Sequence, residues 1–193
     1  VDYSHFMNIT AKVALRMIPD SLATQPIFLC VDDTMVAKAG TRFENVSKLF
    51  DHAAHNGSNY LNGHCFVSIM LCIPVWKNDR VSYLSLPLGY RMWQKKESKL
   101  ELAASMIRQV MPEFQEKKQV IILCDSWYTK QTLVSIVDEY QNLDLIGNAR
   151  IDSVMYDPAP AHTGRRGRPA KHGKRLSVET DFAFSNERSE ITI

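Results

Sequence analysis

Short apolar runs bounded by polar residues recur along the chain and predict a sheet at its centre. The clearest lie at residues 26–32, 63–73, 119–124 and 143–149. Runs of this length that are partly β-branched are typical of strands buried on both faces. Residues 80–86 alternate apolar and polar instead, which predicts a half-exposed strand that forms a hairpin with the strand before it.

Helical spacing of apolar residues appears between these runs. Residues 97–111 and 129–141 each place their apolar side chains on one face and are predicted helices. Residues 1–24 carry a weaker helical pattern, and residues 42–55 predict a short helix or an ordered loop. A helix between two strands implies a parallel crossover. The predicted fold is therefore α/β: three antiparallel strands, then parallel crossovers flanked by helices, which is the order of the ribonuclease-H-like fold.

Composition changes along the chain and suggests four segments. Residues 1–24 form a lead-in segment and residues 25–156 the ribonuclease-H-like core, which is predicted to be incomplete. Residues 157–176 form a basic loop in which proline and glycine oppose regular structure. Residues 177–193 alternate again and predict the start of a β-rich insertion. The chain starts without methionine and stops within a strand-like stretch, so we expect it to be a piece of a longer protein.

The bulk composition is that of a soluble globular protein. Of the 193 residues, 45% are hydrophobic and 23% are charged, and the net charge is only +2, so the chain as a whole is no polycation. No apolar run approaches the roughly 20 residues that a membrane-spanning helix needs. The four cysteines lie in apolar runs without a Cys-x-x-Cys pair, which favours buried reduced thiols over a zinc site.

Carboxylates follow two of the predicted buried strands. Asp32 and Asp33 end the first apolar run, and Asp125 ends the run at 119–124. Ligands and reacting groups gather at this edge of open α/β sheets, and a Mg²⁺ ion takes one or two carboxylates besides phosphate and water. Successive strand side chains face opposite ways, so Asp32 and Asp33 should not both enter one site. An alternative interpretation of Asp125 is that it caps the following helix.

Five sequence segments, in their order and spacing, resemble an insertion-sequence transposase of the DDE superfamily, close to the IS-four-like cut-and-paste group. The segments cover roughly residues 26–176. They are Val31-Asp32-Asp33-Thr34, Asn62-Gly63-His64, Leu86-Pro87-Leu88, Leu123-Cys124-Asp125-Ser126-Trp127-Tyr128, and the basic stretch from Gly164 to Gly173.

The resemblance implies an enzyme and assigns roles to its residues. Asp33, the aspartate before the threonine, would be the first catalytic and metal-binding acid, and Asp125 the second, with Mg²⁺ or Mn²⁺ as the cofactor. The family's third acid is a glutamate on a helix after a β-rich insertion. Glu179, Glu187 and Glu190 do not fit that pattern, so we expect the third acid beyond the end of this chain.

The implied activity is metal-dependent phosphodiester cleavage and strand transfer at transposon ends. The implied partners are double-stranded DNA, both transposon ends and target, and further copies in a dimer or larger assembly, with no membrane. The implied location is the bacterial cytoplasm, in association with the nucleoid. Two alternatives stay open: a structure-specific nuclease of the same fold that cuts without joining, and a non-catalytic DNA-binding remnant that lacks the third acid.

The basic loop is the second candidate site. Its core, Arg166-Gly167-Arg168-Pro169, resembles an AT-hook, in which an extended Arg-Gly-Arg enters a narrow minor groove. Its cations would also contact phosphates, which makes binding sensitive to salt. A solvated basic linker is the alternative. The six candidate DNA-binding residues are Arg165, Arg166, Arg168, Lys171, Lys174 and Arg175. Lys95, Lys96 and Lys99, with Arg91, form a weaker patch that we interpret as an exposed helix start.

Overall fold

The computed structural model describes residues 4–40, 42–50, 59–114, 118–150, 152–161, 168–177 and 180–182. These residues divide into two compact units, one up to Asn148 and one from Ala149 onward. The predicted division at 24, 156 and 176 stays a prediction.

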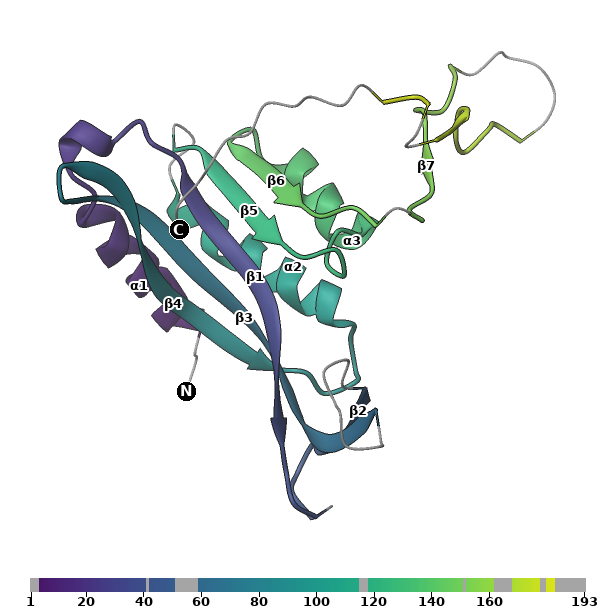
Figure 1. Ribbon diagram of the computed structural model, residues 1–193, viewed down its shortest axis with the longest axis horizontal. Coiled ribbons are helices and arrows are strands. Elements are labelled where there is room, and N and C mark those ends of the chain that lie inside the picture. The colour runs from purple at the N-terminus through teal and green to yellow at the C-terminus, as the bar shows by residue number, and fades with distance from the viewer. Residues whose placement is uncertain are drawn as a thin grey trace. The chain divides into compact units, whose positions relative to one another are not determined.

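The first unit is built on a mixed six-stranded sheet (Figure 1). Its strands run in the order β2-β3-β1-β5-β6, and β4 also pairs with β3. β1 pairs antiparallel with β3 and parallel with β5, and β5 pairs parallel with β6. This arrangement confirms the predicted ribonuclease-H-like sheet. The strands are β1 (Ile27–Ala37), β2 (Ser47–Phe50), β3 (Tyr60–Lys77), β4 (Arg80–Met92), β5 (Val120–Cys124) and β6 (Leu143–Gly147).

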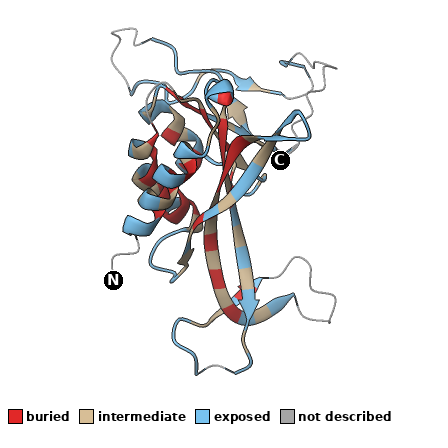
Figure 2. Ribbon diagram, turned by 90° about the vertical axis from the view of Figure 1, so that its left-hand side faces the viewer, coloured by how far each residue is buried: buried red, intermediate tan, exposed pale blue. Residues whose placement is uncertain are grey.

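Helices pack on one face of this sheet, as Figure 2 shows from the side. That face carries the buried, alternate residues of the strands, such as Leu29 and Val31 of β1 and Val67 of β3. The opposite face carries no helix among the described residues. The helices are α1 (Ser4–Arg16), α2 (Lys99–Val110) and α3 (Gln131–Val134), with short 3-10 turns at Asp20–Leu22, Met111–Glu113 and Ser135–Glu139. None of these described helices is long and apolar enough to cross a bilayer.

Helix α2 begins where its sequence predicts. Ser98 accepts a hydrogen bond from the Glu101 amide and Glu101 accepts one from the Ser98 amide, which together form a capping box. This pairing satisfies amide groups that would otherwise lack partners in the first turn. Lys99 is therefore fixed at the first position of α2, directly above the sheet.

Several elements differ from their predicted bounds. β4 continues to Met92, beyond Pro87 and Gly89, because a register shift in its pairing with β3 absorbs the irregularity. A side-chain Cβ at Gly89 would lie 3.0 Å from Met7 of α1, so the glycine lets this helix pack closely. The predicted helix 129–141 is one α-helical turn followed by a 3-10 turn. Within residues 42–55, the structure has the strand β2 instead of a helix, after a left-handed Asn45 (φ 59°), and residues 51–58 lie outside the described part.

The described residues of the second unit include a small antiparallel ladder. β7 (Met155–Tyr156) pairs with β8 (Arg175–Leu176), and the Tyr156 ring stacks on His172 with centroids 4.9 Å apart. The predicted β-rich insertion at 177–193 falls mostly outside the described residues.

Candidate active site

The turn after β5 is organised by Asp125. Its Oδ1 atom accepts hydrogen bonds from the backbone amides of Trp127 (3.0 Å) and Tyr128 (3.2 Å). The carboxylate thus caps this turn, whereas the N-cap of α3 is Lys130. The Asp125 side chain is exposed, and its Oδ2 atom accepts no hydrogen bond from the described part of the chain. Capping therefore uses one carboxylate oxygen and leaves the other for a ligand.

The neighbouring strand β6 holds this turn in place. The Thr129 hydroxyl lies 2.8 Å from the Asp125 carbonyl oxygen and 2.6 Å from the Asn148 carbonyl oxygen, so it bridges the ends of β5 and β6. A Cβ added at Gly147 would lie 3.0 Å from Cys124 Sγ and 3.2 Å from Thr129 Cγ2. The turn that carries Asp125 is thus packed directly on the backbone of β6.

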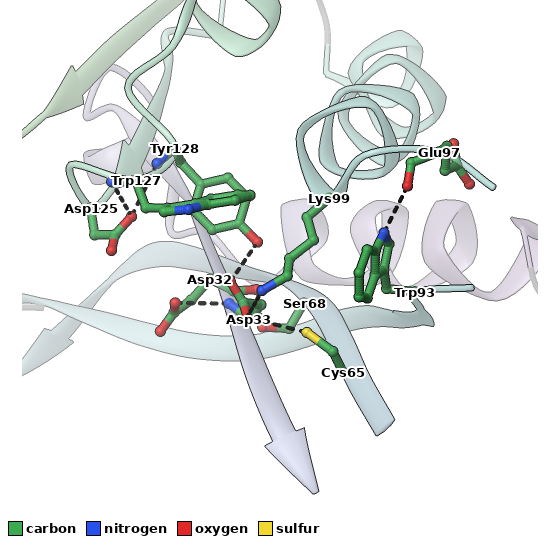
Figure 3. Close-up of polar contacts among 10 residues, drawn as sticks. All are labelled: Asp32, Asp33, Cys65, Ser68, Trp93, Glu97, Lys99, Asp125, Trp127 and Tyr128. Carbon is green, nitrogen blue, oxygen red and sulfur yellow. Dashed lines mark hydrogen bonds and ion pairs between the residues drawn. The ribbon is translucent and has the colours of Figure 1, made fainter. Parts of the chain in front are cut away.

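Asp33 lies in a different environment, on the face of β1 that α2 covers. Its Oδ2 atom accepts hydrogen bonds from Lys99 Nζ (2.7 Å) and Cys65 Sγ (3.2 Å), and its Oδ1 atom accepts one from the Tyr128 hydroxyl (3.1 Å). The exposed fractions of the Asp33 and Lys99 side chains are only 17% and 20%. Figure 3 shows these three donors converging on the Asp33 carboxylate.

This cluster shifts the pKa values of its members. Burial raises the pKa of the Cys65 thiol to about 11, and the hydrogen bond to Asp33 adds to the shift. Burial also raises the pKa of Tyr128, and the negative charge of Asp33 raises it further. For Lys99, burial acts to lower the pKa, but the hydrogen bond and the charge of Asp33 outweigh it, so the pKa is raised. Each donor therefore keeps its proton, and the Lys99 ammonium neutralises the Asp33 carboxylate.

Tyr128 connects the two predicted catalytic acids. Its amide binds Asp125 and its hydroxyl binds Asp33, while the ring between them is almost fully buried. Asp33 and Asp125 therefore lie at opposite ends of one tyrosine (Figure 3). Among the described residues, no group of three or more acidic, histidine or cysteine side chains is arranged to hold a metal ion. Glu179, Glu187 and Glu190 lie outside the described residues.

Asp32 points to the other face of β1 and is exposed. Val31 pairs with Cys124 across the parallel strands β1 and β5, so Asp32 and Asp125 are the next positions along the two strands. The Oδ1 atom of Asp32 accepts a hydrogen bond from the Asp33 amide (2.8 Å), and the Ser68 hydroxyl donates one to the Asp32 backbone carbonyl. Figure 3 shows the Asp32 carboxylate directed away from the Lys99–Asp33 pair.

Two tryptophans flank the lysine above Asp33. Lys99 Nζ lies 5.1 Å from the Trp127 ring centroid and 6.0 Å from that of Trp93. Lys130 Nζ lies 4.5 Å from the Trp127 ring on the same loop. Trp127 remains 37% exposed, so its indole and Lys130 form a cationic, aromatic surface beside Asp125. Contacts of this kind suit nucleic acid, because bases stack on aromatic rings and phosphates bind cations.

The four residues of the weaker basic patch differ in their exposure and in their partners. Lys99 is not an exposed helix-start residue, because it forms the ion pair with Asp33. Arg91 donates hydrogen bonds to Ser105 (3.2 Å) and to Gln109 of α2. Lys95 and Lys96 are exposed, as predicted. Sequence spacing could not identify the role of Lys99, since its partner lies 66 residues away.

The basic loop is described only in part. Arg165 and Arg166, including half of the AT-hook-like core, lie outside the described residues. Arg168 and Lys171 are exposed. Lys174 pairs with Asp181 at 2.8 Å, and Arg175 belongs to β8, so regular structure reaches into the segment predicted to lack it. The ion pair leaves Lys174 less available for phosphate than the exposed Arg168 and Lys171.

The sequence matches the family described as DDE superfamily endonuclease over residues 7–187, nearly the whole chain. The chain belongs to this family. DDE endonucleases depend in general on divalent metal ions. No curated protein matches the sequence.

Three solved structures resemble this DDE endonuclease at low identity. A chain of the Mos1 strand transfer complex is 13% identical, with a TM-score of 0.31 over 78% of this chain. A chain of the Mos1 transposase paired-end complex with left transposon end is 11% identical, with a TM-score of 0.33 over 76%. A chain of the Drosophila P element transposase strand transfer complex is 11% identical, with a TM-score of 0.33 over 88% of this chain. The DDE endonuclease chain spans 41%, 42% and 36% of the lengths of these chains, respectively.

Proposed function

We propose that this DDE endonuclease chain is the catalytic core of a DNA transposase. In this proposal it cleaves phosphodiester bonds at transposon ends and joins the freed 3′-hydroxyl to target DNA. The family match over residues 7–187 carries the proposal, and the carboxylates within β1 and directly after β5 give it a chemical basis. Double-stranded DNA would be the substrate, bound by a dimer or larger assembly in the bacterial cytoplasm.

The donor set at this edge fits a hard divalent cation. Mg²⁺ or Mn²⁺ prefers carboxylate oxygens together with water and substrate phosphate. Asp125 offers an unbonded Oδ2 on a turn that is fixed by two amides and by Thr129. Asp33 is the second candidate ligand by resemblance, and Asp32 is its neighbour on the same strand. When bound there, such a cation would stabilise the charge that develops on the transferring phosphate.

The chain's own residues would position DNA and the ion. Asp125 would hold the ion at the sheet edge, and Tyr128 would keep the turn fixed through its amide contact with Asp125 and its hydroxyl contact with Asp33. Trp127 and Lys130 would contact the strand next to the scissile bond, one by stacking and one by charge. Arg165, Arg166, Arg168, Lys171, Lys174 and Arg175 would bind phosphates or a minor groove farther along the DNA.

The test uses the whole protein with DNA that carries its element ends. With Mg²⁺ or Mn²⁺, we expect nicked ends and joined products on a target plasmid, and neither with EDTA. Asp125→Asn should remove both products while DNA binding persists in a gel-shift assay. Cleavage without joining would favour the nuclease alternative. Salt-sensitive binding with no cleavage under either metal would favour a non-catalytic remnant.

A further inference from the structure

The adjacent residues Asp32 and Asp33 of β1 lie on opposite faces of the sheet. Asp33 shares the face of Val31 and Leu29, which α2 covers, whereas Asp32 shares the face that carries no helix among the described residues. Only one of the two can therefore face the exposed carboxylate of Asp125. The contacts of each aspartate indicate which one it is.

The Asp33 carboxylate already accepts three hydrogen bonds. Three donors occupy its two oxygens, and one of them is an ammonium 2.7 Å away that is itself mostly buried. A metal ion at Oδ2 of Asp33 would have to displace Lys99 and leave it without a counter-charge, although the Lys99 side chain is only one-fifth exposed. Removing one partner of a buried ion pair is strongly unfavourable, because the other charge stays desolvated.

Asp32 has the opposite properties. It is exposed, no described cation pairs with its carboxylate, and it directly follows Val31, which forms the last β1–β5 pair with Cys124, the residue before Asp125. Neighbouring strands lie about 5 Å apart, a separation at which two carboxylates can bind one divalent ion. The same row of the sheet continues through Ser68 of β3 to Tyr90 of β4, which is 59% exposed. This row gives DNA a polar, accessible surface that ends at Asp125.

We propose that Asp32, and not Asp33, is the β1 carboxylate that shares a divalent ion with Asp125. Asp33 is then a positioning residue: through Lys99 it attaches β1 to α2, through Tyr128 it attaches β1 to the Asp125 turn, and it thereby fixes where Asp32 points. This assignment rests on the proposed function, but its central claim concerns metal binding alone.

The test has two measurements on the whole protein without DNA. Electron paramagnetic resonance measures Mn²⁺ binding, and thermal unfolding measures stability. Asp32→Asn and Asp125→Asn should each weaken Mn²⁺ binding at least about tenfold, with an unchanged unfolding temperature. Asp33→Asn should lower the unfolding temperature. The double variant Asp33→Asn/Lys99→Met removes the unpaired ammonium and should recover both the unfolding temperature and Mn²⁺ binding. Asp138→Asn, an exposed aspartate on the 3-10 turn after α3, is the matched control.

The decisive comparison is between Asp32→Asn and the double variant. Loss of Mn²⁺ binding in the double variant at a restored unfolding temperature, with normal binding in Asp32→Asn, would overturn the assignment, because Asp33 would then be the ligand. A wild-type protein that binds no Mn²⁺ would also overturn it. If Mn²⁺ binding depends on Asp32 but the wild-type protein neither cuts nor joins DNA, the proposed function fails and the Asp32 assignment stands.

Discussion

The two strands that carry the candidate acids end differently. β5 stops at Cys124, and Asp125 leaves the sheet to cap a turn. β1 instead continues through Asp32 and Asp33 to Ala37, five residues beyond Asp32. A carboxylate beyond a strand end can orient freely, whereas a carboxylate within a strand must follow the alternation of side chains. An apolar run followed by aspartate can therefore place the acid either beyond a strand or inside it.

Replacing Asp125 tests the strand-end carboxylate and should have the largest effect. Asn caps turns about as well as Asp, so Asp125→Asn should keep the two amide contacts and the stability of the protein. It removes the negative charge that would bind the ion, so DNA cleavage should fall below detection. Cleavage of end-bearing DNA is the measurement, with urea unfolding as the check. Wild-type cleavage in this variant would exclude Asp125 as a ligand.

Replacing Lys99 tests the carboxylate inside the strand. Lys99→Met leaves Asp33 partly buried without its cation, and we expect a loss of roughly 2 kcal/mol in the free energy of unfolding. Lys130→Met is the matched control, because Lys130 also lies over Trp127 but forms no ion pair within the described residues. The control should change stability by less than about 0.5 kcal/mol. Equal effects in urea titrations would mean that the Lys99–Asp33 pair contributes nothing.

Alkaline pH offers a second test of the Asp33 cluster. The pKa of Cys65 is about 11 in the folded protein against an ordinary 9.0, so the folded state holds its proton more tightly than the unfolded state. Its contribution to stability is complete below pH 9 and is lost as the pH rises from 9 to 11. The raised pKa values of Lys99 and Tyr128 act in the same direction above pH 10.

The measurement is the free energy of unfolding from pH 8 to 11. It should fall more steeply in the wild-type protein than in Cys65→Ala, which lacks the thiol. Parallel curves for the two proteins would show that the thiol titrates normally in the folded state.

Removing the Tyr128 hydroxyl should have the smallest effect. Tyr128→Phe keeps the ring buried in the core and loses one hydrogen bond to Asp33, so we expect a cost of about 1 kcal/mol in the free energy of unfolding. Mn²⁺ binding should stay at the wild-type value, because the Asp125 turn depends on the Tyr128 amide and not on its hydroxyl. A loss of Mn²⁺ binding in this variant would place the hydroxyl in the metal site.

Much of the sheet could be predicted from the sequence because its strands are buried apolar runs. β3, β5 and β6 begin or end within a few residues of their predicted limits. The extent of β1 could not be predicted from the sequence, since Asp32-Asp33-Thr34 is as polar as a loop. Its strand conformation depends on pairing with β3, whose residues 63–68 lie about thirty residues later in the chain. Polar strand segments of this kind are stabilised by their neighbours and not by their own propensity.

The candidate site was predictable only in part for a similar reason. Asp125 was identifiable, because it directly follows the buried apolar run from Val120 to Cys124. The environment of Asp33 was not, because its three partners come from β3, α2 and the turn after β5. Alternation alone indicated that Asp32 and Asp33 diverge, but only the position of α2 shows which of them is enclosed.

Gly147 limits how this site can vary. Any side chain there would press on Cys124 and Thr129, the residues on either side of the turn that carries Asp125. Even the methyl group of alanine would require Cys124 or Thr129 to shift by a few tenths of an ångström. The smallest residue of β6 thus limits the space around the turn that follows the neighbouring strand, although it has no chemistry of its own.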